Sequence, residues 1–232
     1  MNTPEILFED GEALVINKPA GLPIDRPRKG GECLEDHLEA LKLGFQRAPV
    51  AVHRLDTDTS GCLLLARNPK SLKRFNKAFE ERLVTKTYLA VLAGHPEGES
   101  GTIRLKLSKI SSEAKGWRMI AAKKGKEAVS HWELLEKLGP HAVIRFTPET
   151  GRTHQLRIHA HKGLGAPLLG DPIYGSESQR SAAKKPGGAR RTMLHASRII
   201  MPRDGKPAIE AHAPLPADFV GLGVSEPVVA DG

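Results

Sequence analysis

A polar run, HRLDTDTSG at 53–61, passes directly into the apolar run CLLLA at 62–66. The apolar run is typical of a buried strand, so Asp56 and Asp58 stand at the entrance to that strand. A partly buried carboxylate costs free energy unless a cation or hydrogen-bond donors face it. An ordinary Asp-rich turn that caps a strand is one interpretation. Arg54 beside the acids, and an arginine-rich motif far downstream, favour a functional site instead.

Composition restricts the partners and the compartment. The chain has 232 residues, enough for one large domain or two small ones, and its formal net charge is +8. Such a charge favours nucleic acid first and an anionic membrane surface second, although a merely basic soluble protein stays possible. Cys33 and Cys62 give no disulfide framework. The acidic start MNTPEILFED is unlike a signal peptide, and no run approaches the ~18 apolar residues of a membrane span, so we expect a soluble, cytoplasmic protein.

The first 85 residues predict a hairpin, a turn and two helices. Apolar runs flank Asp10-Gly11, which predicts two antiparallel strands within 6–17, and KPAGL at 18–22 predicts a turn. Leucines at 34, 38 and 41 have the spacing of a short amphipathic helix. A clearer helix begins with Asn68 as N-cap and Pro69 at its first position. Its apolar stripe consists of Leu72, Phe75, Phe79 and Leu83, and its other face carries Lys70, Lys73, Arg74, Lys77 and Arg82.

Short strands are expected at 87–93, 102–107, 117–121, 128–135 and 142–147, and their spacing favours antiparallel pairing. THQLRIHAH at 153–161 predicts a helix. Residues 176–192 are poor in apolar side chains, which predicts a mobile basic loop with Lys184, Lys185, Arg190 and Arg191. The tail after Phe219 is expected to be loosely ordered. Phosphate contacts are expected from the basic helix face and from this loop, although a solvated helix face is the plainer interpretation.

Two further motifs carry candidate site residues. In TKTYLAVLAG at 85–94, a strand would place Tyr88, Ala90 and Leu92 on one face, where Tyr88 is either a packed tyrosine or a ring that stacks a base. In PETGRTHQLRIHAH at 148–161, Arg157 could pair with a carboxylate in a bidentate manner. A metal site at His154, His159 and His161 is less favoured, because Arg152 and Arg157 would oppose a divalent cation.

Other enzyme classes lack their sequence signals. No G-x-S-x-G elbow supports a hydrolase triad that uses Ser60. GLGAPLLG at 163–170 has the wrong spacing for a dinucleotide-binding loop. A glycosidase would need two carboxylates that converge on a substrate, and nothing indicates that Asp56 and Asp58 do so.

The three motifs resemble the signatures of the RluA-type family of pseudouridine synthases. The family pattern K-x-Y-x-A-x-V-x-G is matched from Lys86 to Gly94, with Leu92 in place of the Val, and G-R-[ST]-H-Q-[IL]-R-x-H is matched from Gly151 to His159. The resemblance extends from about Leu14 to Phe219. Its other segments are VINKPAGL, GDPIYG at 170–175, MLHA at 193–196 and HAPLPADF at 212–219. Ala166 departs from the histidine that relatives usually carry there.

The resemblance implies an α+β fold, with a long, bent, mostly antiparallel mixed sheet and flanking helices around a central cleft. It implies one catalytic domain over 1–232 without a separate N-terminal RNA-binding domain. The implied reaction isomerises uridine in ribosomal or transfer RNA to pseudouridine, with no cofactor and no metal. Asp56 is the implied catalytic carboxylate, Arg157 its partner and Tyr88 the ring that stacks the flipped uracil. Substrate-binding roles are expected for His53, Arg54, Arg152, His154 and Leu194.

Two other classes stay open at this stage. A basic RNA-binding module without catalysis would bind RNA and form no product, but Asp56, Tyr88 and Arg157 together speak against it. A nucleoside hydrolase would release free base. The role of Asp56, as nucleophile at the sugar or as base toward a ribose proton, is not decided by the sequence.

Overall fold

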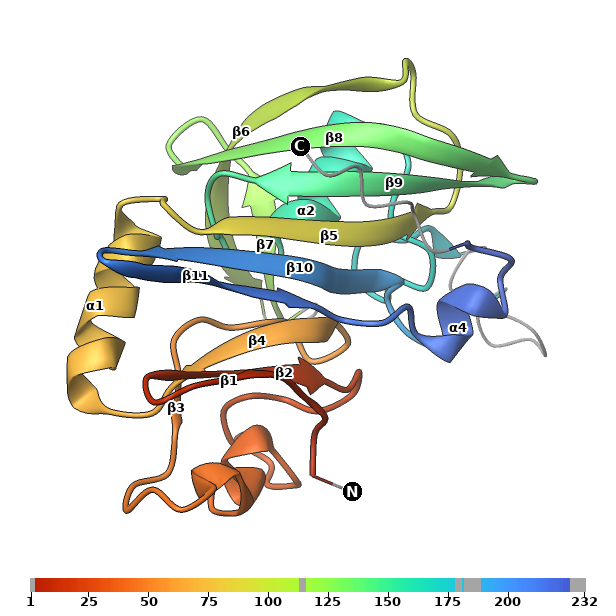
Figure 1. Cartoon of the computed structure of the whole chain (residues 1–232). Coiled ribbons are helices and arrows are strands. Elements are labelled where there is room, and N and C mark those ends of the chain that lie inside the picture. Colours follow the sequence, from red (N-terminus) through yellow and green to blue (C-terminus); the bar gives the residue numbers. More distant parts are fainter. Residues whose placement is uncertain (1–2, 113–115, 178–180, 182–188, 226–232) are drawn as a thin grey trace. The chain divides into compact units, whose positions relative to one another are not determined.

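The computed structural model describes residues 3–112, 116–177, 181 and 189–225 (Figure 1). The chain divides into two compact units. The N-terminal unit comprises Met1–Thr87 and Ala196–Pro214, and the C-terminal unit comprises Tyr88–His195 and Leu215–Gly232. Most of the expected mobile loop, including Lys184 and Lys185, lies outside the described residues. The single catalytic domain over 1–232 stays a prediction.

The sheet of the N-terminal unit begins with three antiparallel strands. β1 (Ile6–Glu9) pairs with β2 (Ala13–Lys18), which pairs with β4 (Ser60–Ala66). The turn between β1 and β2 is stabilised by the Asp10 carboxylate, which accepts hydrogen bonds from the amides of Glu12 and Ala13 at 2.8 and 2.9 Å. The predicted hairpin is therefore confirmed. β10 (Leu194–Arg203) follows β4 in the sheet, β11 (Lys206–His212) pairs with β10, and the short β3 (Val50–Ala51) pairs with β4.

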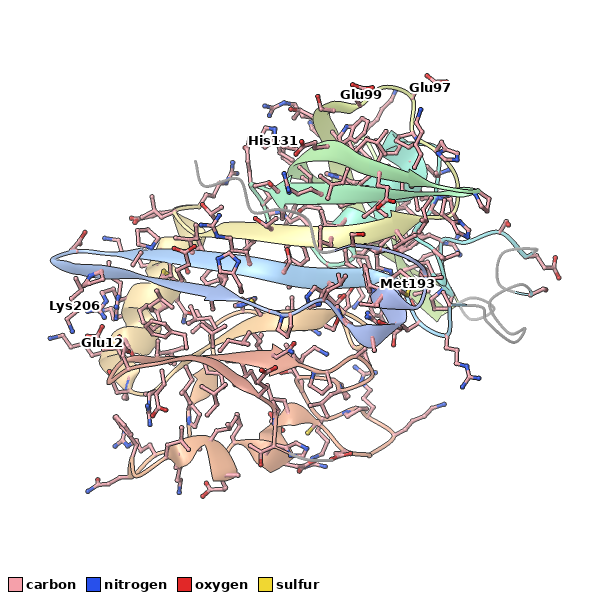
Figure 2. The ribbon with its side chains drawn as sticks, turned by 45° about the vertical axis from the view of Figure 1, so that its right-hand side comes forward. Glu12, Glu97, Glu99, His131, Met193 and Lys206 are labelled. Carbon is pink, nitrogen blue, oxygen red and sulfur yellow. The ribbon has the colours of Figure 1, made fainter. Side chains whose placement is uncertain are left out.

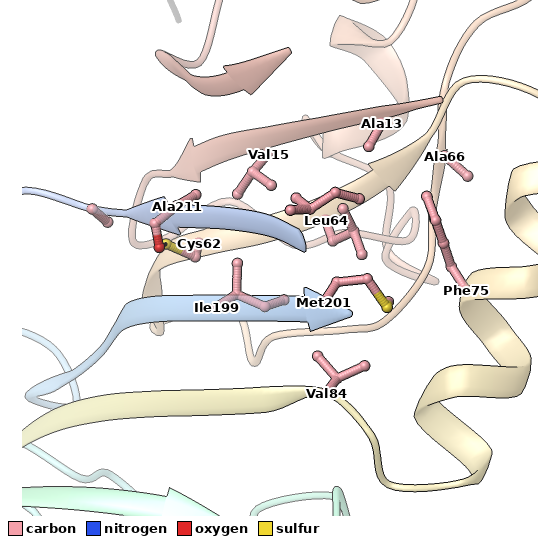
Figure 3. Close-up of a cluster of buried hydrophobic side chains, with 12 residues drawn as sticks. Ala13, Val15, Cys62, Leu64, Ala66, Phe75, Val84, Ile199, Met201 and Ala211 are labelled. Atoms are coloured by element: carbon pink, nitrogen blue, oxygen red, sulfur yellow. Dashed lines mark hydrogen bonds between the residues drawn. The ribbon is translucent and has the colours of Figure 1, made fainter. Parts of the chain in front are cut away.

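The predicted buried strand is confirmed, because every residue of β4 is buried. Alternate side chains of β4, Cys62, Leu64 and Ala66, join a hydrophobic cluster with residues of β2, β10, β11 and α1 (Pro69–Glu80) (Figure 3). Gly61, which ends the polar run, has a φ of +106°, and a Cβ there would lie 2.2 Å from the Ala196 carbonyl oxygen. A glycine at the second position of β4 thus permits close backbone packing.

Helix α1 begins as predicted and ends earlier than predicted. The Asn68 side chain accepts a hydrogen bond from the Ser71 amide at 2.9 Å, and Pro69 occupies the first turn. The helix ends at Glu80, where Arg82 adopts a φ of 60° and the Leu83 amide donates to the Ala78 carbonyl at 2.9 Å. This Schellman-type end leaves Leu83 53% exposed. Placing Leu83 on the apolar stripe was therefore wrong.

The amphipathic helix expected around 34–41 is replaced by two short 3₁₀ turns. These turns span Leu34–His37 and Ala40–Lys42, and Leu43 follows in a left-handed conformation. The leucine spacing still identified the buried side chains, since Leu34 and Leu41 are almost fully buried. The Leu38 amide donates to the Glu35 carbonyl at 3.4 Å and the Leu41 amide to the Leu38 carbonyl at 3.1 Å, and these i→i+3 hydrogen bonds are the 3₁₀ pattern.

The C-terminal unit contains a second run of antiparallel strands in the order β5-β9-β8-β6-β7 (Figure 1). Their bounds are Thr85–Leu92 for β5, Ser100–Ser112 for β6, Gly116–Ala121 for β7, Lys126–Leu138 for β8 and His141–Pro148 for β9. Each strand expected in this region is confirmed, although β6 and β8 are longer than their apolar runs suggested. The predicted α+β class with antiparallel pairing is confirmed.

Two consecutive helical segments follow β9 and form the expected helix in this region. α2 (Gln155–Ile158) passes into a π-helical turn at His159–Gly163, and His154 precedes α2 with a φ of 52°. A short helix, α4 (Ala217–Val220), lies in the segment that returns to this unit, and the Val224 amide donates to the Phe219 carbonyl at 3.1 Å. The expected loose order after Phe219 is therefore wrong as far as Val224, and residues 226–232 of that tail lie outside the described residues. Among the described residues, no helix combines the length and apolar character needed to cross a bilayer.

Candidate active site

The loop that carries Asp56 is fixed by a buried lysine. Lys18 is fully buried, and its ammonium donates hydrogen bonds to the Thr57 carbonyl at 3.1 Å and to two carbonyls of the KPAGL turn at 2.8 Å. The Gly21 amide donates to the same Thr57 carbonyl at 2.9 Å. A buried ammonium is stable only when oxygen acceptors surround it in this way. The backbone next to Asp56 is thus held by residues about 40 positions earlier in the chain.

Asp56 itself is half-buried, and its carbonyl accepts a hydrogen bond from the Thr59 amide at 3.0 Å. This turn leads into β4. Arg54 is exposed, and its guanidinium lies 3.5 Å from the Asp25 carboxylate. Asp58, the second acid of the run, is also half-buried. The loop therefore presents an acid and a solvent-accessible cation two residues apart.

His53 contributes to the shape of this loop. Its Nε2 atom accepts a hydrogen bond from the Leu64 amide at 3.1 Å, and its ring stacks on Phe79 at 4.9 Å. Burial, with the nearby Lys86 ammonium, lowers the pKa of His53 to about 3. The imidazole is therefore neutral at pH 7 and joins the start of the loop to β4 and α1. Its expected contact with substrate stays a prediction.

Tyr88 lies on β5 in the C-terminal unit. Opposite it on β9 is Phe146. Tyr88, Ala90 and Leu92 all contact one hydrophobic cluster, which confirms that they share a face of the strand. Leu194, an expected substrate-binding residue, is buried in the same cluster. One side of the Tyr88 ring is thus supported by packed apolar side chains.

Arg157 forms a buried ion pair with Asp171. Its Nε and one terminal nitrogen donate to the two carboxylate oxygens at 2.7 and 2.8 Å. The amides of Ile173 and Tyr174 also donate to Asp171, at 2.8 and 3.0 Å. Burial alone would raise the pKa of Asp171, but the hydrogen bonds and charge of Arg157 outweigh it and lower that pKa. Asp171 therefore fixes the orientation of the Arg157 guanidinium.

The first turn of α2 is tied to β8 through Gln155. Its amide nitrogen donates to the Val129 carbonyl at 3.0 Å and to the Ser130 hydroxyl at 2.9 Å. Its amide oxygen accepts from the Thr150 hydroxyl at 2.8 Å and from the Arg152 backbone amide at 2.9 Å. All four hydrogen-bonding positions of this buried side chain are used. The start of the helix that carries Arg157 is consequently fixed to the sheet.

The three histidines of the segment have different surroundings. His154 contacts the Tyr174 hydroxyl at 3.0 Å, whereas neither ring nitrogen of the buried His159 has a hydrogen-bond partner among the described residues. Burial lowers the pKa of His159 to about 4. The His161 ring lies 6.4 Å from the Tyr174 ring. No group of three metal-ligating side chains occurs among the described residues.

Comparisons with family models, with sequence relatives and with solved structures all indicate the same protein family. A family model described as RNA pseudouridylate synthase matches residues 12–162. The chain belongs to this family. An uncharacterized RNA pseudouridine synthase of Zymomonas mobilis is 51% identical over 218 residues, which cover 94% of this chain and 96% of that relative. The resemblance to RluA-type pseudouridine synthases is confirmed.

Other relatives of this pseudouridine synthase have more specific names. Ribosomal large subunit pseudouridine synthase C of Rickettsia felis is 38% identical over 87% of this chain and 64% of its own length. Ribosomal large subunit pseudouridine synthase D of Zymomonas mobilis is 33% identical over 93% of this chain and 70% of its own. The solved structure of human RNA pseudouridylate synthase domain containing 1 has a TM-score of 0.76 and 31% identity, covering 94% of this chain and 87% of that one. The protein is accordingly an RNA isomerase.

The predicted site residues of this pseudouridine synthase are divided between the two units. His53, Arg54 and Asp56 belong to the N-terminal unit, whereas the C-terminal unit contains Tyr88, Arg152, His154, Arg157 and Leu194. The Arg152 Nε donates to the Glu127 carbonyl at 3.0 Å. Pairing between Arg157 and Asp56 stays a prediction. Sequence reasoning missed Asp171 and Gln155, although both lie within quoted motifs, because an acid or an amide in a sequence does not reveal its partner.

Proposed function

We propose that this pseudouridine synthase modifies ribosomal RNA and that Asp56 is its catalytic carboxylate. The observation that carries the assignment of Asp56 is its loop, in which a buried lysine and the Gly21 amide hold the adjacent Thr57 carbonyl. A reacting carboxylate benefits from such a fixed backbone, because its geometry need not be ordered during the reaction. The preference for ribosomal RNA rests on the names of the C and D relatives. Transfer RNA is the second candidate substrate.

In the proposed reaction, the bond between uracil N1 and the ribose breaks, the uracil turns, and carbon 5 bonds to the ribose. Carbon 5 loses its proton and N1 gains one, so the rearrangement needs no net oxidant and no water. The Asp56 carboxylate acts either as nucleophile at the sugar or as base toward a ribose proton. Both roles require the ionised form, which an arginine such as Arg157 would favour.

The target uridine must leave its stack before it can react. Tyr88 is proposed to stack the flipped uracil, since its ring is backed by an apolar cluster. Arg54 is proposed to occupy the vacated space and to hold a phosphate, since it is exposed and two residues from Asp56. Substrate contacts are also proposed for His53, Arg152, His154 and Leu194.

The assignment of Asp56 is tested by comparing Asp56→Asn with Asp58→Asn. Tritium release from RNA labelled at carbon 5 of uridine measures the reaction directly, because this position loses its hydrogen. Asp56→Asn should abolish release and leave RNA affinity near that of the wild type, because phosphate contacts dominate affinity. Asp58→Asn should retain turnover. If Asp56→Asn releases tritium normally while a folded Asp58→Asn is inactive, our assignment of the catalytic acid is wrong.

The substrate is tested by mapping pseudouridines in total RNA from cells with and without the gene. We expect the missing modification in large-subunit ribosomal RNA. A loss confined to transfer RNA would assign the second candidate substrate instead. Activity in the presence of a strong chelator is also expected, and a zinc-dependent recovery of lost activity would revive the three-histidine metal site.

A further inference from the structure

The C-terminal unit displays an exposed tryptophan at the end of a continuous aromatic array. Trp117 on β7 is 46% exposed, and the Lys109 ammonium lies 4.9 Å from its ring centre. The His154 ring lies 5.0 Å from the Trp117 ring at an interplanar angle of 31°. Tyr174 contacts His154 edge-on at 5.7 Å, and the Arg157 guanidinium lies 5.2 Å from the Tyr174 ring. The array thus connects an exposed indole to the motif that carries Arg157.

The strand register places this aromatic group and its cation on the same face. β6 and β7 pair antiparallel, with Ser111 opposite Trp117 and Lys109 opposite Met119. Opposed residues share a face of a sheet, as do residues two apart along a strand. Lys109 and Trp117 are therefore diagonal neighbours. The backbone register alone therefore places both residues on one face.

Hydrogen bonds hold the array in place. The Tyr174 hydroxyl accepts from the Met119 amide at 3.2 Å and donates to the Met119 carbonyl at 3.1 Å. Because a hydroxyl carries one hydrogen, the 3.0 Å contact with His154 requires the His154 Nδ1 to donate. The His154 ring is thereby oriented against Trp117. A ring held in advance loses little conformational entropy when it binds a ligand.

A groove with a volume of about 1110 Å³ lies beside this array. Its rim includes Arg118, Lys162, His161 and Tyr174, and none of its described lining residues is acidic. Lys109, Arg118 and Lys162 form no ion pair with a carboxylate of the described residues. The groove therefore carries cationic charge, and the exposed ring of Trp117 stands next to its lining residue Arg118 in the chain. Proteins that bind single-stranded nucleic acid use this combination of a basic groove and stacking rings.

We propose that Trp117 and Lys109 form a stacking platform for a base of single-stranded RNA outside the reacting uridine, with the neighbouring phosphates at Arg118 and Lys162. This inference rests on the proposed RNA substrate and adds a second contact region to it. Stacking of a base on an aromatic ring is generally stronger than an exposed lysine–aromatic contact, so a base can replace the Lys109 ammonium over the ring. The displaced ammonium is then available to a phosphate.

Binding is tested with a 12-residue RNA that lacks uridine, so that no isomerisation is involved. The chain has two tryptophans, and Trp132 is only 8% exposed. Quenching of fluorescence by the RNA should therefore occur in the wild type and be largely absent in Trp117→Phe. In a binding assay with labelled RNA, Trp117→Ala should weaken affinity about tenfold, and Trp117→Phe should weaken it less, because a phenyl ring still stacks.

Phe45 provides a matched control. It is 38% exposed, and the Arg67 guanidinium lies 3.7 Å from its ring centre, but it belongs to the N-terminal unit. Phe45→Ala should leave the affinity within about twofold of the wild type. Equal quenching in the wild type and Trp117→Phe would overturn the platform. Equal weakening by Phe45→Ala and Trp117→Ala, or an unchanged affinity of a correctly folded Trp117→Ala, would do the same.

Tritium release from a uridine-containing RNA separates this inference from the proposed function. Trp117→Ala should raise KM with little change in kcat, because stacking outside the reacting base contributes equally to the bound substrate and the transition state. Turnover of ribosomal RNA without Trp117-dependent quenching would refute the platform and leave the proposed function standing. Trp117-dependent quenching by the uridine-free RNA, without turnover of ribosomal RNA, would support the platform and contradict the proposed substrate.

Discussion

In the N-terminal unit, three cations surround a single carboxylate, whereas the cations beside the groove of the C-terminal unit have no carboxylate partner among the described residues. Glu12 lies 2.5 Å from Arg74, 3.1 Å from Lys206 and 3.4 Å from Arg203. Figure 2 shows Glu12 and Lys206 side by side. Burial would raise the pKa of Glu12, but hydrogen bonds from Lys206 and Arg74 outweigh it and lower the pKa.

This difference shows why the net charge of +8 does not locate a binding surface. A cation paired with a carboxylate contributes little field at a distance, whereas an unpaired cation retains its attraction for phosphate. In the helix expected to bind phosphates, Arg74 pairs with Glu12 and Lys77 lies 3.6 Å from Glu81. Arg191 of the expected basic loop pairs with Asp218 at 2.5 Å. We therefore expect the groove of the C-terminal unit to attract RNA more strongly than these positions.

The largest effect is expected where a paired cation is buried. Asp171→Ala would leave the Arg157 guanidinium buried without this partner, which typically costs roughly 3–5 kcal/mol. Glu12→Ala removes a partly exposed partner from the N-terminal network and should cost no more than about 1 kcal/mol. Urea unfolding of the two variants and the wild type at pH 7 measures both effects. Similar losses in the two variants would contradict the distinction between a buried pair and a surface network.

The next largest effect is a pH dependence of stability, which we expect from one neutral histidine in each unit. The pKa of His159 is about 4 and that of His53 about 3, both below the ordinary 6.5. Between pH 6.5 and about 4, the unfolded chain binds more protons than the folded chain, so stability falls as the pH falls. Each histidine should remove on the order of 2 kcal/mol at pH 5 relative to pH 7.5.

His159→Leu should abolish the contribution of His159 and also remove two buried nitrogens that have no hydrogen-bond partner among the described residues. His53→Gln should abolish the other contribution and keep an acceptor for the Leu64 amide. Urea unfolding at pH 7.5 and pH 5 measures the loss in each variant. If the stability of both variants falls with pH as much as that of the wild type, burial does not keep the two histidines neutral in the folded protein.

Local sequence signals predicted the elements that support the site. Three predictions that depend on near neighbours in the chain are confirmed. They are the buried strand at 62–66, the Asn68 cap, and the shared strand face of Tyr88, Ala90 and Leu92. The hairpin of β10 and β11 was not predicted. Its signal was available, because Asp204-Gly205 stands between two strand-like runs.

The sequence did not reveal which side chains far apart in the chain form hydrogen bonds or ion pairs. The ion pair between Arg157 and Asp171, 14 residues farther along the chain, was not predicted, and the pairing of Arg157 with Asp56 that the resemblance implied stays a prediction. The fixation of Thr57 by Lys18 joins residues 39 positions apart. The end of α1 was missed for a different reason, because a left-handed conformation at Arg82 does not follow from its residue type.

A smaller effect on RNA binding is expected from the unpaired cations of the C-terminal unit. If Lys109, Arg118 and Lys162 each contact one phosphate, their joint replacement by Gln should reduce the salt slope by roughly 2, since each contact on single-stranded RNA contributes about 0.7. Affinity for a single-stranded RNA at several salt concentrations measures the slope. An unchanged slope would mean that these three cations do not contact phosphates, and that only stacking at Trp117 could contribute to binding there.

The smallest effect is expected from the paired cations of α1. Arg74→Gln with Lys77→Gln removes the same type of charge as the triple variant, but each lost charge is compensated by a carboxylate in the protein. We expect the salt slope to change by less than about 0.7, the value of one phosphate contact. Stability should fall by at most about 1 kcal/mol, because both pairs are partly exposed. The two variant sets should therefore give clearly different slopes on the same RNA. A larger change for the α1 variant would mean that RNA displaces Glu12 and Glu81 from their cations, and that the pairs seen in the structure do not prevent phosphate binding.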